Sequence, residues 1–295
     1  MSLFAYEFMQ RALLGVLVTG LATPALGIYL VQRRLALIGD GIGHVALTGV
    51  GLGLLTSRSP VLTAIVVAAA GAIAVELIRQ RGKTSGDIAL ALLFYGGISG
   101  GVFLVALAEG RTNANLIAYL FGSPLTTSTT DLIVMAALGG AILAVTLLLR
   151  PWLFAICQDE EYARVAGLPV RTLNLVLAVT TAVTVTVAMR AVGLLLVSAM
   201  MVVPVAAAQL VTRGFRSTMA LSMGLGLLAA AAGITFAAQY DTAPGATIVL
   251  VAIAMFAAIA IGSSGWRAIR RRAAVAGRTP SLPPEPEPPE VVLTK

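Results

Sequence analysis

The sequence predicts an all-α polytopic integral membrane protein with about eight or nine transmembrane helices. Of its 295 residues, 58% are hydrophobic and only 11% are charged, whereas an ordinary soluble domain has roughly 25% charged residues. Apolar runs of about 18 or more residues recur along nearly the whole chain, and such runs are long enough to cross a bilayer as helices. These runs are continuous rather than alternating, so helices are favoured over the strands of a membrane barrel.

The apolar runs divide the chain into nine predicted spans. They are placed at 12–31, 36–56, 60–78, 88–108, 131–149, 172–189, 191–212, 217–238 and 243–263. We therefore expect a transmembrane domain over residues 1–265 and a separate tail over 266–295. The first span is longer than the apolar region of a signal peptide and has no cleavage site, so we expect it to be retained.

The charges predict the orientation of these spans in the cell membrane. Basic residues gather in five segments, at 33–34, 79–87, 150–171, 213–216 and 266–272. Counting the spans alternately places all five on one side, which the positive-inside rule assigns to the cytoplasm, and it places the N-terminus outside. The net charge of +7 is thus explained by loops and tail, and we expect no nucleic-acid partner.

Two segments do not fit the pattern of spans. Residues 113–130 are too short and polar to cross, and with Gly122 and Pro124 they resemble an interfacial or re-entrant segment on the outer side. The tail is basic at first and then, from about residue 277, rich in Pro and Glu, which is typical of a disordered cytoplasmic extension. No soluble catalytic domain remains, so the sequence does not indicate an enzyme.

One pair of residues in the second predicted span indicates chemistry. Asp40 and His44 stand four positions apart, which puts both side chains on one face of a helix, one turn from each other. Ionisable residues inside a span are functional candidates by default, and a carboxylate with an imidazole is a suitable ligand pair for Zn²⁺ or Mn²⁺. Two ligands are too few for a tight site, but a symmetric dimer meeting at this helix could supply the other two.

A simpler interpretation of the pair also stands. Asp40 could cap the second helix, while His44 only hydrogen-bonds to a neighbour. The surrounding glycines favour close helix packing or a broken, pore-lining segment; they are Gly39, Gly41, Gly43, Gly49, Gly51 and Gly53. Spacing alone leaves both interpretations open.

The second informative stretch is the predicted cytoplasmic segment 156–170. Its acidic cluster, Asp159, Glu160 and Glu161, favours the start of a short amphipathic helix, and Gly167 with Pro169 predicts where that helix stops. The segment is either an ordinary capped surface helix or a coupling helix that docks into a partner ATPase.

Three further residues deserve mention for their position. Pro204 would interrupt the hydrogen bonds of the seventh span, as a gate or a passive kink would require. Asp241 in the last outer loop could line an entrance or simply be a solvated loop residue. Glu76, near the inner end of the third span, is expected to snorkel or to pair with Arg79 rather than to take part in transport.

Four sequence blocks resemble those of one known family. RRLALIGDGIGHVALTGVGLG, QDEEYARVAGLPVRTLNLVL, AVGLLLVSAMMVVPVAAAQL and DTAPGATIVLVA occur in this order and are similar to the ABC-3 type permeases of zinc, manganese and iron importers. The resemblance covers roughly residues 10–262 and excludes the tail. Each block alone is modestly specific, but the four blocks in the same order are strong evidence of the resemblance.

The resemblance implies a permease that is homodimeric or pseudo-symmetric, with two cytoplasmic ABC ATPase subunits and an extracytoplasmic metal-binding protein. It implies no permanently bound cofactor, and a transported Zn²⁺, or Mn²⁺ or Fe²⁺. Asp40 and His44 match the motif residues that line the path in such permeases. The coupling region of the family falls on Glu160, Glu161, Ala166 and Gly167.

Two other classes remain as rivals at this stage. An ion-coupled secondary transporter would need no ATPase partner, but usually shows inverted repeats and paired broken helices, which are not evident here. A structural or receptor-like membrane protein would need neither a metal nor a coupling segment.

Overall fold

The computed structural model describes residues 6–80, 86–108, 122, 129–191 and 193–276, and within these ranges it is all-helical. In the part of the chain that the structure describes, eight helices are long and apolar enough to cross a membrane. They are α1 (Glu7–Gln32), α2 (Ile38–Leu55), α3 (Pro60–Gln80), α4 (Gly86–Leu107), α6 (Thr129–Leu148), α9 (Val170–Ala191), α11 (Phe215–Tyr240) and α12 (Pro244–Ala276). The predicted class of all-α polytopic membrane protein is confirmed.

One predicted span is shorter than expected. In place of a full-length span at 191–212, the structure has α10 (Leu194–Gln209), with 16 residues. Gly193 precedes it with a φ of 93°, a left-handed conformation that glycine adopts without strain. At about 1.5 Å per residue, α10 covers roughly 24 Å, less than the hydrocarbon thickness of about 30 Å.

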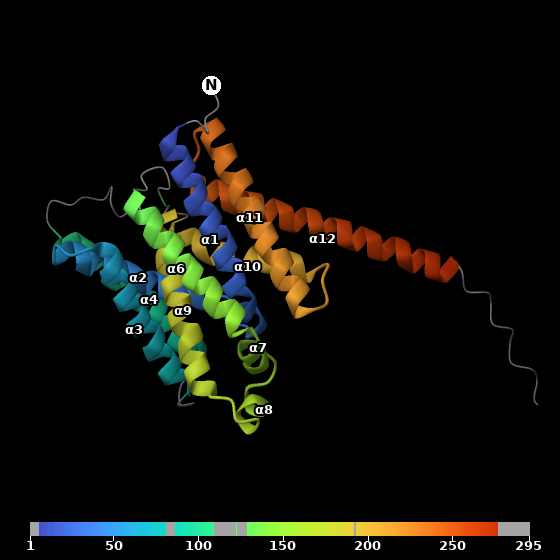
Figure 1. Ribbon diagram of the computed structural model, residues 1–295, viewed down its shortest axis with the longest axis horizontal. Coiled ribbons are helices and arrows are strands. Elements are labelled where there is room, and N and C mark those ends of the chain that lie inside the picture. The colour runs from blue at the N-terminus through green and yellow to red at the C-terminus, as the bar shows by residue number, and fades with distance from the viewer. Residues whose placement is uncertain (1–5, 81–85, 109–121, 123–128, 192, 277–295) are drawn as a thin grey trace, which may run out of the picture.

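Several predictions fall on segments outside the described residues. They are the outer segment 113–130 apart from Gly122 and the beginning of α6, the loop residues 81–85, and the Pro- and Glu-rich tail from residue 277. The last helix continues as far as Ala276, so the basic stretch that follows Trp266 is helical. Figure 1 shows α12 extending well away from the other helices.

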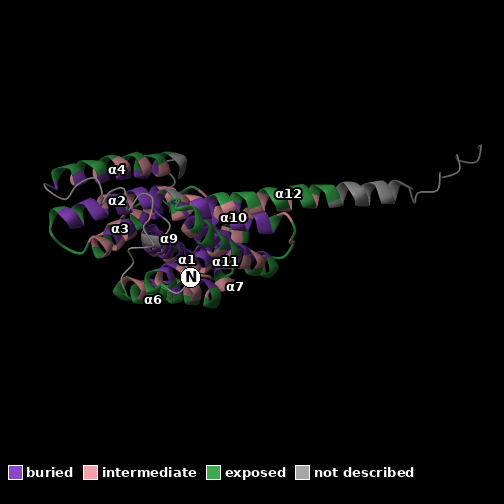
Figure 2. Cartoon of the chain, turned by 90° about the horizontal axis from the view of Figure 1, so that it is seen from above, coloured by how far each residue is buried: buried purple, intermediate pink, exposed green. Residues whose placement is uncertain are grey.

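The bundle is built around three central helices. In their most apolar stretches, α1 and α9 are each 72% buried and α2 is 67% buried, whereas the other five long helices are 22–44% buried. Figure 2 shows the same contrast, with many exposed residues (green) along α4 and α12. The exposed apolar faces are those expected to meet lipid or another protein.

Glycines allow the central helices to approach their neighbours closely. A Cβ added to Gly20 of α1 would lie 2.8 Å from the carbonyl oxygen of Gly226 on α11, and one on Gly27 would lie 2.0 Å from that of Met201 on α10. Close backbone contact of this kind holds membrane helices together, because lipid provides no hydrophobic drive between them.

The turn from α1 to α2 is short and is stabilised by several backbone hydrogen bonds. Leu35 donates its backbone N–H to the carbonyl of Leu30 at 2.8 Å, and Arg34 donates to that of Val31 at 3.1 Å. This is the Schellman pattern of a helix C-terminus, and it places Arg34 at a φ of 58°. Ile38 then donates to the carbonyl of Leu35 at 3.0 Å, so α2 begins directly after the turn.

Candidate functional site

Asp40 and His44 lie on the same face of α2, as their spacing predicted. The His44 Nε2 atom is 3.8 Å from Asp40 Oδ1, and the two side chains are 6% and 25% exposed. That distance is too long for a hydrogen bond. The two groups are therefore close enough to share a ligand but do not satisfy each other.

His44 is held in place mainly by α4. Its ring meets the ring of Phe94 edge-on, with the centroids 4.5 Å apart. A Cβ added to Gly97 would lie 2.6 Å from the backbone carbonyl carbon of His44, so α4 packs directly on the backbone there. Thr48, one turn further along α2, donates its hydroxyl to the carbonyl of Gly97 at 2.8 Å.

One nitrogen of this histidine has no partner. The Nδ1 atom of His44 is buried and makes no hydrogen bond, and such orphaned polar atoms are unusual and call for an explanation. The Nδ1 atom therefore gives no support to the interpretation in which His44 only hydrogen-bonds to a neighbour. In the same interpretation Asp40 caps α2, but Leu37 occupies the N-cap position and Asp40 lies in the first turn.

Asp40 lines a hollow between α2 and α4. The hollow has a volume of about 460 Å³ and is lined by Leu37, Asp40, Leu90, Ala91, Phe94 and Tyr95. Leu37 and Tyr95 are 68% and 69% exposed, so the rim of the hollow is apolar and uncovered. Across the described part of the chain, no group of three or more His, Cys, Asp or Glu residues converges on one point. The pair therefore stands alone in the described part of the chain, without a third such residue beside it.

The glycines of α2 serve packing on several sides rather than a break in the helix. A Cβ on Gly49 would lie 2.6 Å from the Cα of Ala64 on α3, and one on Gly51 would lie 2.8 Å from the Cβ of Leu104 on α4. The helix itself is continuous from Ile38 to Leu55. Its small residues let α3 and α4 enclose the helix that carries the pair.

The predicted acidic segment forms two short helices, α7 (Arg150–Gln158) and α8 (Glu160–Val165). Asp159 is the N-cap of α8, and its carboxylate accepts a hydrogen bond from the backbone N–H of Tyr162 at 2.9 Å. Gly167 follows α8 with a φ of 81°, in keeping with its predicted role as a stop. The helix and its capping were thus predicted correctly.

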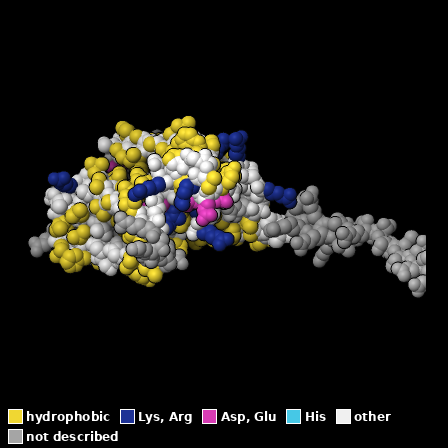
Figure 3. Space-filling model, turned by 90° about the horizontal axis from the view of Figure 1, so that it is seen from below, with side chains coloured by type: hydrophobic (Ala, Val, Ile, Leu, Met, Phe, Trp, Pro, Cys, Tyr) yellow, Lys and Arg dark blue, Asp and Glu magenta, His cyan; other side chains and the backbone are white. Residues whose placement is uncertain are grey.

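The segment residues face two ways. Glu161, Ala166 and Gly167 are exposed, at the end of the bundle where Figure 1 places α8. The face seen from below in Figure 3 gathers basic side chains around a group of acidic ones. Glu160, in contrast, is turned toward the bundle.

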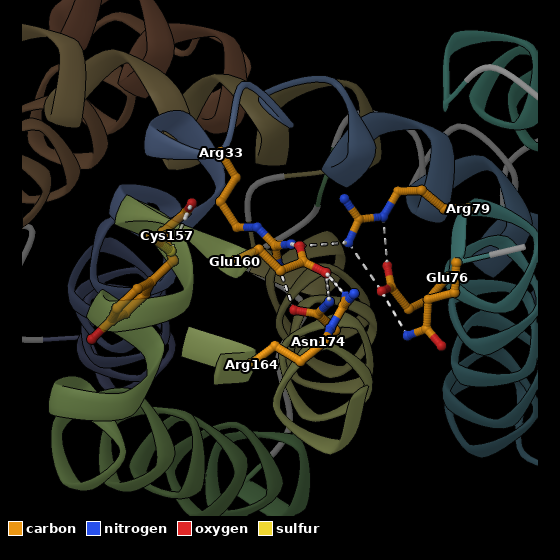
Figure 4. A network of polar contacts seen from close by, with 9 residues as sticks. Arg33, Glu76, Arg79, Cys157, Glu160, Arg164 and Asn174 are labelled. Carbon is orange, nitrogen blue, oxygen red and sulfur yellow. Dashed lines mark hydrogen bonds and ion pairs between the residues drawn. The ribbon is translucent and has the colours of Figure 1, made fainter. Parts of the chain in front are cut away.

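Glu160 is the centre of a polar network that joins four elements (Figure 4). Its Oε2 atom is 2.8 Å from Nη2 of Arg33, which follows α1, and 4.0 Å from Nη2 of Arg79 on α3. Its Oε1 atom accepts a hydrogen bond from the amide of Asn174 on α9 at 3.3 Å and is 3.5 Å from Nη2 of Arg164. Arg33 also donates to the side-chain oxygen of Asn174 at 2.8 Å, which closes a triangle.

The predicted pairing of Glu76 with Arg79 is present and extends this network. Glu76 is buried at 4% exposure, and it accepts hydrogen bonds from Arg79 Nε at 2.9 Å, from Arg79 Nη2 at 3.0 Å and from Gln80 at 3.0 Å. A two-point bond of this kind is strong and directional. A hollow of about 500 Å³ lies beside the network, lined by Arg79, Gln80, Glu160, Arg164, Val170, Arg171 and Asn174.

The other two candidates lie away from both clusters. Pro204 is buried within α10, which continues as one helix around it. Asp241 is exposed and forms the C-cap of α11 in a left-handed conformation, with a φ of 51°.

Sequence reasoning missed the network around Glu160. Arg33 was assigned only to a basic loop, and Asn174 only to an apolar span. The available signal was Asn174 itself, since a polar amide near the end of a span needs partners.

Over most of its length, this chain is similar to proteins of one known family. Residues 5–263 match the model of the ABC 3 transport family. The manganese transport system membrane protein MntC of Halalkalibacterium halodurans is 32% identical over 255 residues, covering 86% of this chain and 87% of that protein. The high-affinity zinc uptake system membrane protein ZnuB of Haemophilus influenzae is 30% identical over 253 residues, covering 85% and 96%.

The fold is also that of a solved structure, PsaBC from Streptococcus pneumoniae in complex with Fab. The TM-score is 0.79 at 29% identity, covering 87% of this chain and 92% of that one. Eight apolar helices and these membrane relatives define a multi-pass membrane protein. The chain belongs to the ABC 3 transport family. It is a permease subunit of this family.

Proposed function

We propose that this chain is the membrane-spanning subunit of an ATP-driven importer for a divalent transition metal, in which Asp40 and His44 bind the ion in transit. The observation that carries the proposal is the pair itself. The Nε2 atom of His44 lies 3.8 Å from Oδ1 of Asp40 without a hydrogen bond between them, and Nδ1 of the same ring is buried without a hydrogen-bond partner. An imidazole nitrogen and a carboxylate oxygen are good ligands for Zn²⁺, and acceptable ones for Mn²⁺ and Fe²⁺. The relatives in manganese and zinc systems support a metal as the cargo.

Zinc is the metal we favour, because an imidazole ligand suits it better than it suits manganese. A pair of ligands alone would bind weakly, and a second copy of the chain could complete the set. Asp40 lies in a hollow whose rim carries exposed Leu37 and Tyr95. Exposed apolar side chains of this kind are candidates for contact with another protein or with lipid. Two copies meeting there would bring their two Asp40 carboxylates to one contact, with His44 one helical turn away from each.

The segment containing α8 is the proposed docking site for the cytoplasmic ATPase. Its outward residues Glu161, Ala166 and Gly167 are exposed, and the basic segments of the chain put this end on the cytoplasmic side. The opposite side would receive the ion from an extracytoplasmic binding protein. There Asp241 is exposed at a helix end and is a candidate for the rim of the entrance, while Pro204 in the short helix α10 is a candidate for a gate.

The test is metal uptake by proteoliposomes containing the permease, its ATPase and its binding protein. Asp40→Ala and His44→Ala should each reduce ATP-dependent uptake of Zn²⁺ at least tenfold without preventing assembly with the ATPase. Glu7→Ala removes an exposed carboxylate that pairs with neighbouring Arg11, and should leave uptake unchanged. Uptake at the wild-type rate in the double variant Asp40→Ala/His44→Ala would refute a transit role for the pair.

The same vesicles distinguish the rival class. A secondary transporter would take up the metal along an ion gradient without ATP or the ATPase. Uptake that requires a proton or sodium gradient and ignores ATP would therefore overturn the proposal. Repeating the assay with Mn²⁺ and Fe²⁺ in competition with Zn²⁺ would identify the preferred cargo.

A further inference from the structure

Glu160 belongs to the segment expected to face the ATPase, yet its carboxylate points into the bundle (Figure 4). Both of its oxygens are engaged, Oε2 by Arg33 at 2.8 Å and Oε1 by Asn174 at 3.3 Å. Glu161, the next residue on the same helix, is exposed. The two acidic residues are therefore in different environments, and only Glu160 connects α8 to other helices.

We propose that Glu160 is a positioning residue that ties α8, through Arg33, to the helix carrying Asp40 and His44. This inference rests on the proposed function and names the physical link by which the ATPase would act on the metal pair. Glu160 touches no metal in this scheme. It acts by fixing the position of Arg33 relative to α8.

The chain path makes the link short. Arg33 is the C-cap of α1, and the hydrogen-bonded turn after it leads directly into α2, where Asp40 lies in the first turn. The backbone N–H groups of Arg34, Leu35 and Ile38 are all bonded within this segment. Because the turn is short and hydrogen-bonded, we expect a displacement of Arg33 by α8 to move the start of α2 as well.

Asn174 and Arg79 hold the link against the rest of the bundle. Arg33 is bonded at once to Glu160 and to Asn174 of α9, which requires the forked guanidinium of arginine. Arg79 lies 4.0 Å from Glu160 and is fixed by the buried Glu76. Glu160 is thus the anion between two arginines from α1 and α3 that would otherwise repel each other.

The burial of Arg33 makes this contact sensitive to substitution. Its side chain is only 6% exposed, and a buried charge that loses its partner is strongly disfavoured. A motion of α8 that stretched the pair would be resisted, and the start of α2 would follow it. Coupling through discrete contacts of this kind requires a measurable energetic linkage between the two sites.

The experiment measures uptake of Zn²⁺ and hydrolysis of ATP in the same proteoliposomes, with the full permease–ATPase complex. Glu160→Gln keeps the size of the side chain and removes its charge. We expect it to lower the number of metal ions transported per ATP at least tenfold, with ATP hydrolysis within about twofold of wild type. Arg33→Lys keeps the charge but cannot span both partners, and should lower the same ratio by a smaller factor, about threefold.

Two comparisons separate coupling from stability and from docking. Glu161→Gln removes a neighbouring charge from the exposed face, and is expected to weaken ATPase binding without changing the ratio of ions to ATP in assembled complexes. The double variant Arg33→Lys/Glu160→Gln should have the same ratio as Glu160→Gln alone, because both changes break one link. Multiplied losses in the double variant would indicate two independent structural defects and would overturn the inference.

The outcomes also separate this inference from the proposed function. If the wild-type complex shows no ATP-driven uptake, the proposed function fails. If the wild type transports but Glu160→Gln and Arg33→Lys keep the wild-type ratio, only the link fails. Should Glu160→Gln not assemble, Arg33→Lys decides: an unchanged ratio overturns the link and a lowered one, with hydrolysis retained, supports it.

Discussion

The close contact of α4 with the backbone at His44 leads to a prediction that compares two adjacent glycines. A Cβ on Gly97 would lie 2.6 Å from both the carbonyl carbon of His44 and the nitrogen of Val45, whereas a Cβ on Gly96 would meet nothing within 4 Å. Both residues lie inside α4. Replacing each with alanine therefore adds the same methyl group to the same helix, in contact with α2 in one case and free in the other.

The magnitude follows from the geometry. The contacts of Gly97→Ala are with backbone atoms, so no side-chain rotation relieves them, and α4 must move away from α2 by roughly 0.8 Å to restore ordinary contact at 3.4 Å. Overpacking of this kind costs about 1–3 kcal/mol. Alanine gains up to about 1 kcal/mol over glycine in helix propensity, equally at both positions. Gly97→Ala should thus be about 1–3 kcal/mol less stable than Gly96→Ala.

The assay is thermal unfolding of the two variants and the wild type in detergent, followed by metal uptake after reconstitution. We expect the melting temperature of Gly97→Ala to lie several degrees below that of Gly96→Ala, at very roughly 2–4 °C per kcal/mol. Uptake should fall in Gly97→Ala because the displaced helix is the one that positions His44. Equal melting temperatures and equal uptake for the two variants would refute the packing argument.

Three further predictions concern single residues. Arg34→Gly should raise stability by about 0.5–1 kcal/mol, since Arg34 holds a φ of 58° that glycine adopts freely; a lower melting temperature would contradict this. Tyr29→Phe should lower stability by about 1–2 kcal/mol, because the buried hydroxyl of Tyr29 donates to the carbonyl of Thr146 at 2.7 Å; an unchanged unfolding midpoint would argue against that bond. Burial raises the pKa of the Cys157 thiol from the ordinary value of 9.0 to about 11. At pH 8 its thiolate fraction should therefore be about 100-fold below that of an ordinary thiol, and maleimide labelling of the folded protein should accelerate about tenfold per pH unit up to about pH 11. Fast labelling at pH 7 would exclude such burial.

Much of the architecture could be predicted from the sequence, because in a membrane the helix is the structure that satisfies its own backbone. Length and composition of the apolar runs therefore located eight of the nine predicted spans. The capped helix at Asp159 was also predictable, since capping depends on residues a few positions apart. The seventh span was overestimated, because the apolar run is interrupted by the left-handed Gly193, whose conformation composition does not reveal.

Only part of the candidate metal site could be predicted from the sequence. The spacing of Asp40 and His44 placed them on one face of a helix, since helical periodicity is local. The packing of the helices decides which side of α2 faces α4. It also leaves the Nδ1 atom of His44 without a hydrogen-bond partner. The spacing could not exclude a histidine that hydrogen-bonds to a neighbour, whereas in the packed structure the Nδ1 atom makes no such bond.

From its residues alone, this chain was committed to a helical membrane domain, a capped acidic helix and an Asp/His pair, because each of these depends on neighbours within a turn or two. The network around Glu160 depended on the packed bundle, since it brings together Arg33, Arg79 and Asn174 from helices far apart in the chain. The physical reason is that a charge near the end of a span needs compensation nearby, and the sequence states this need without naming the partner that meets it. Three helix ends had to be packed together before the partner could be identified.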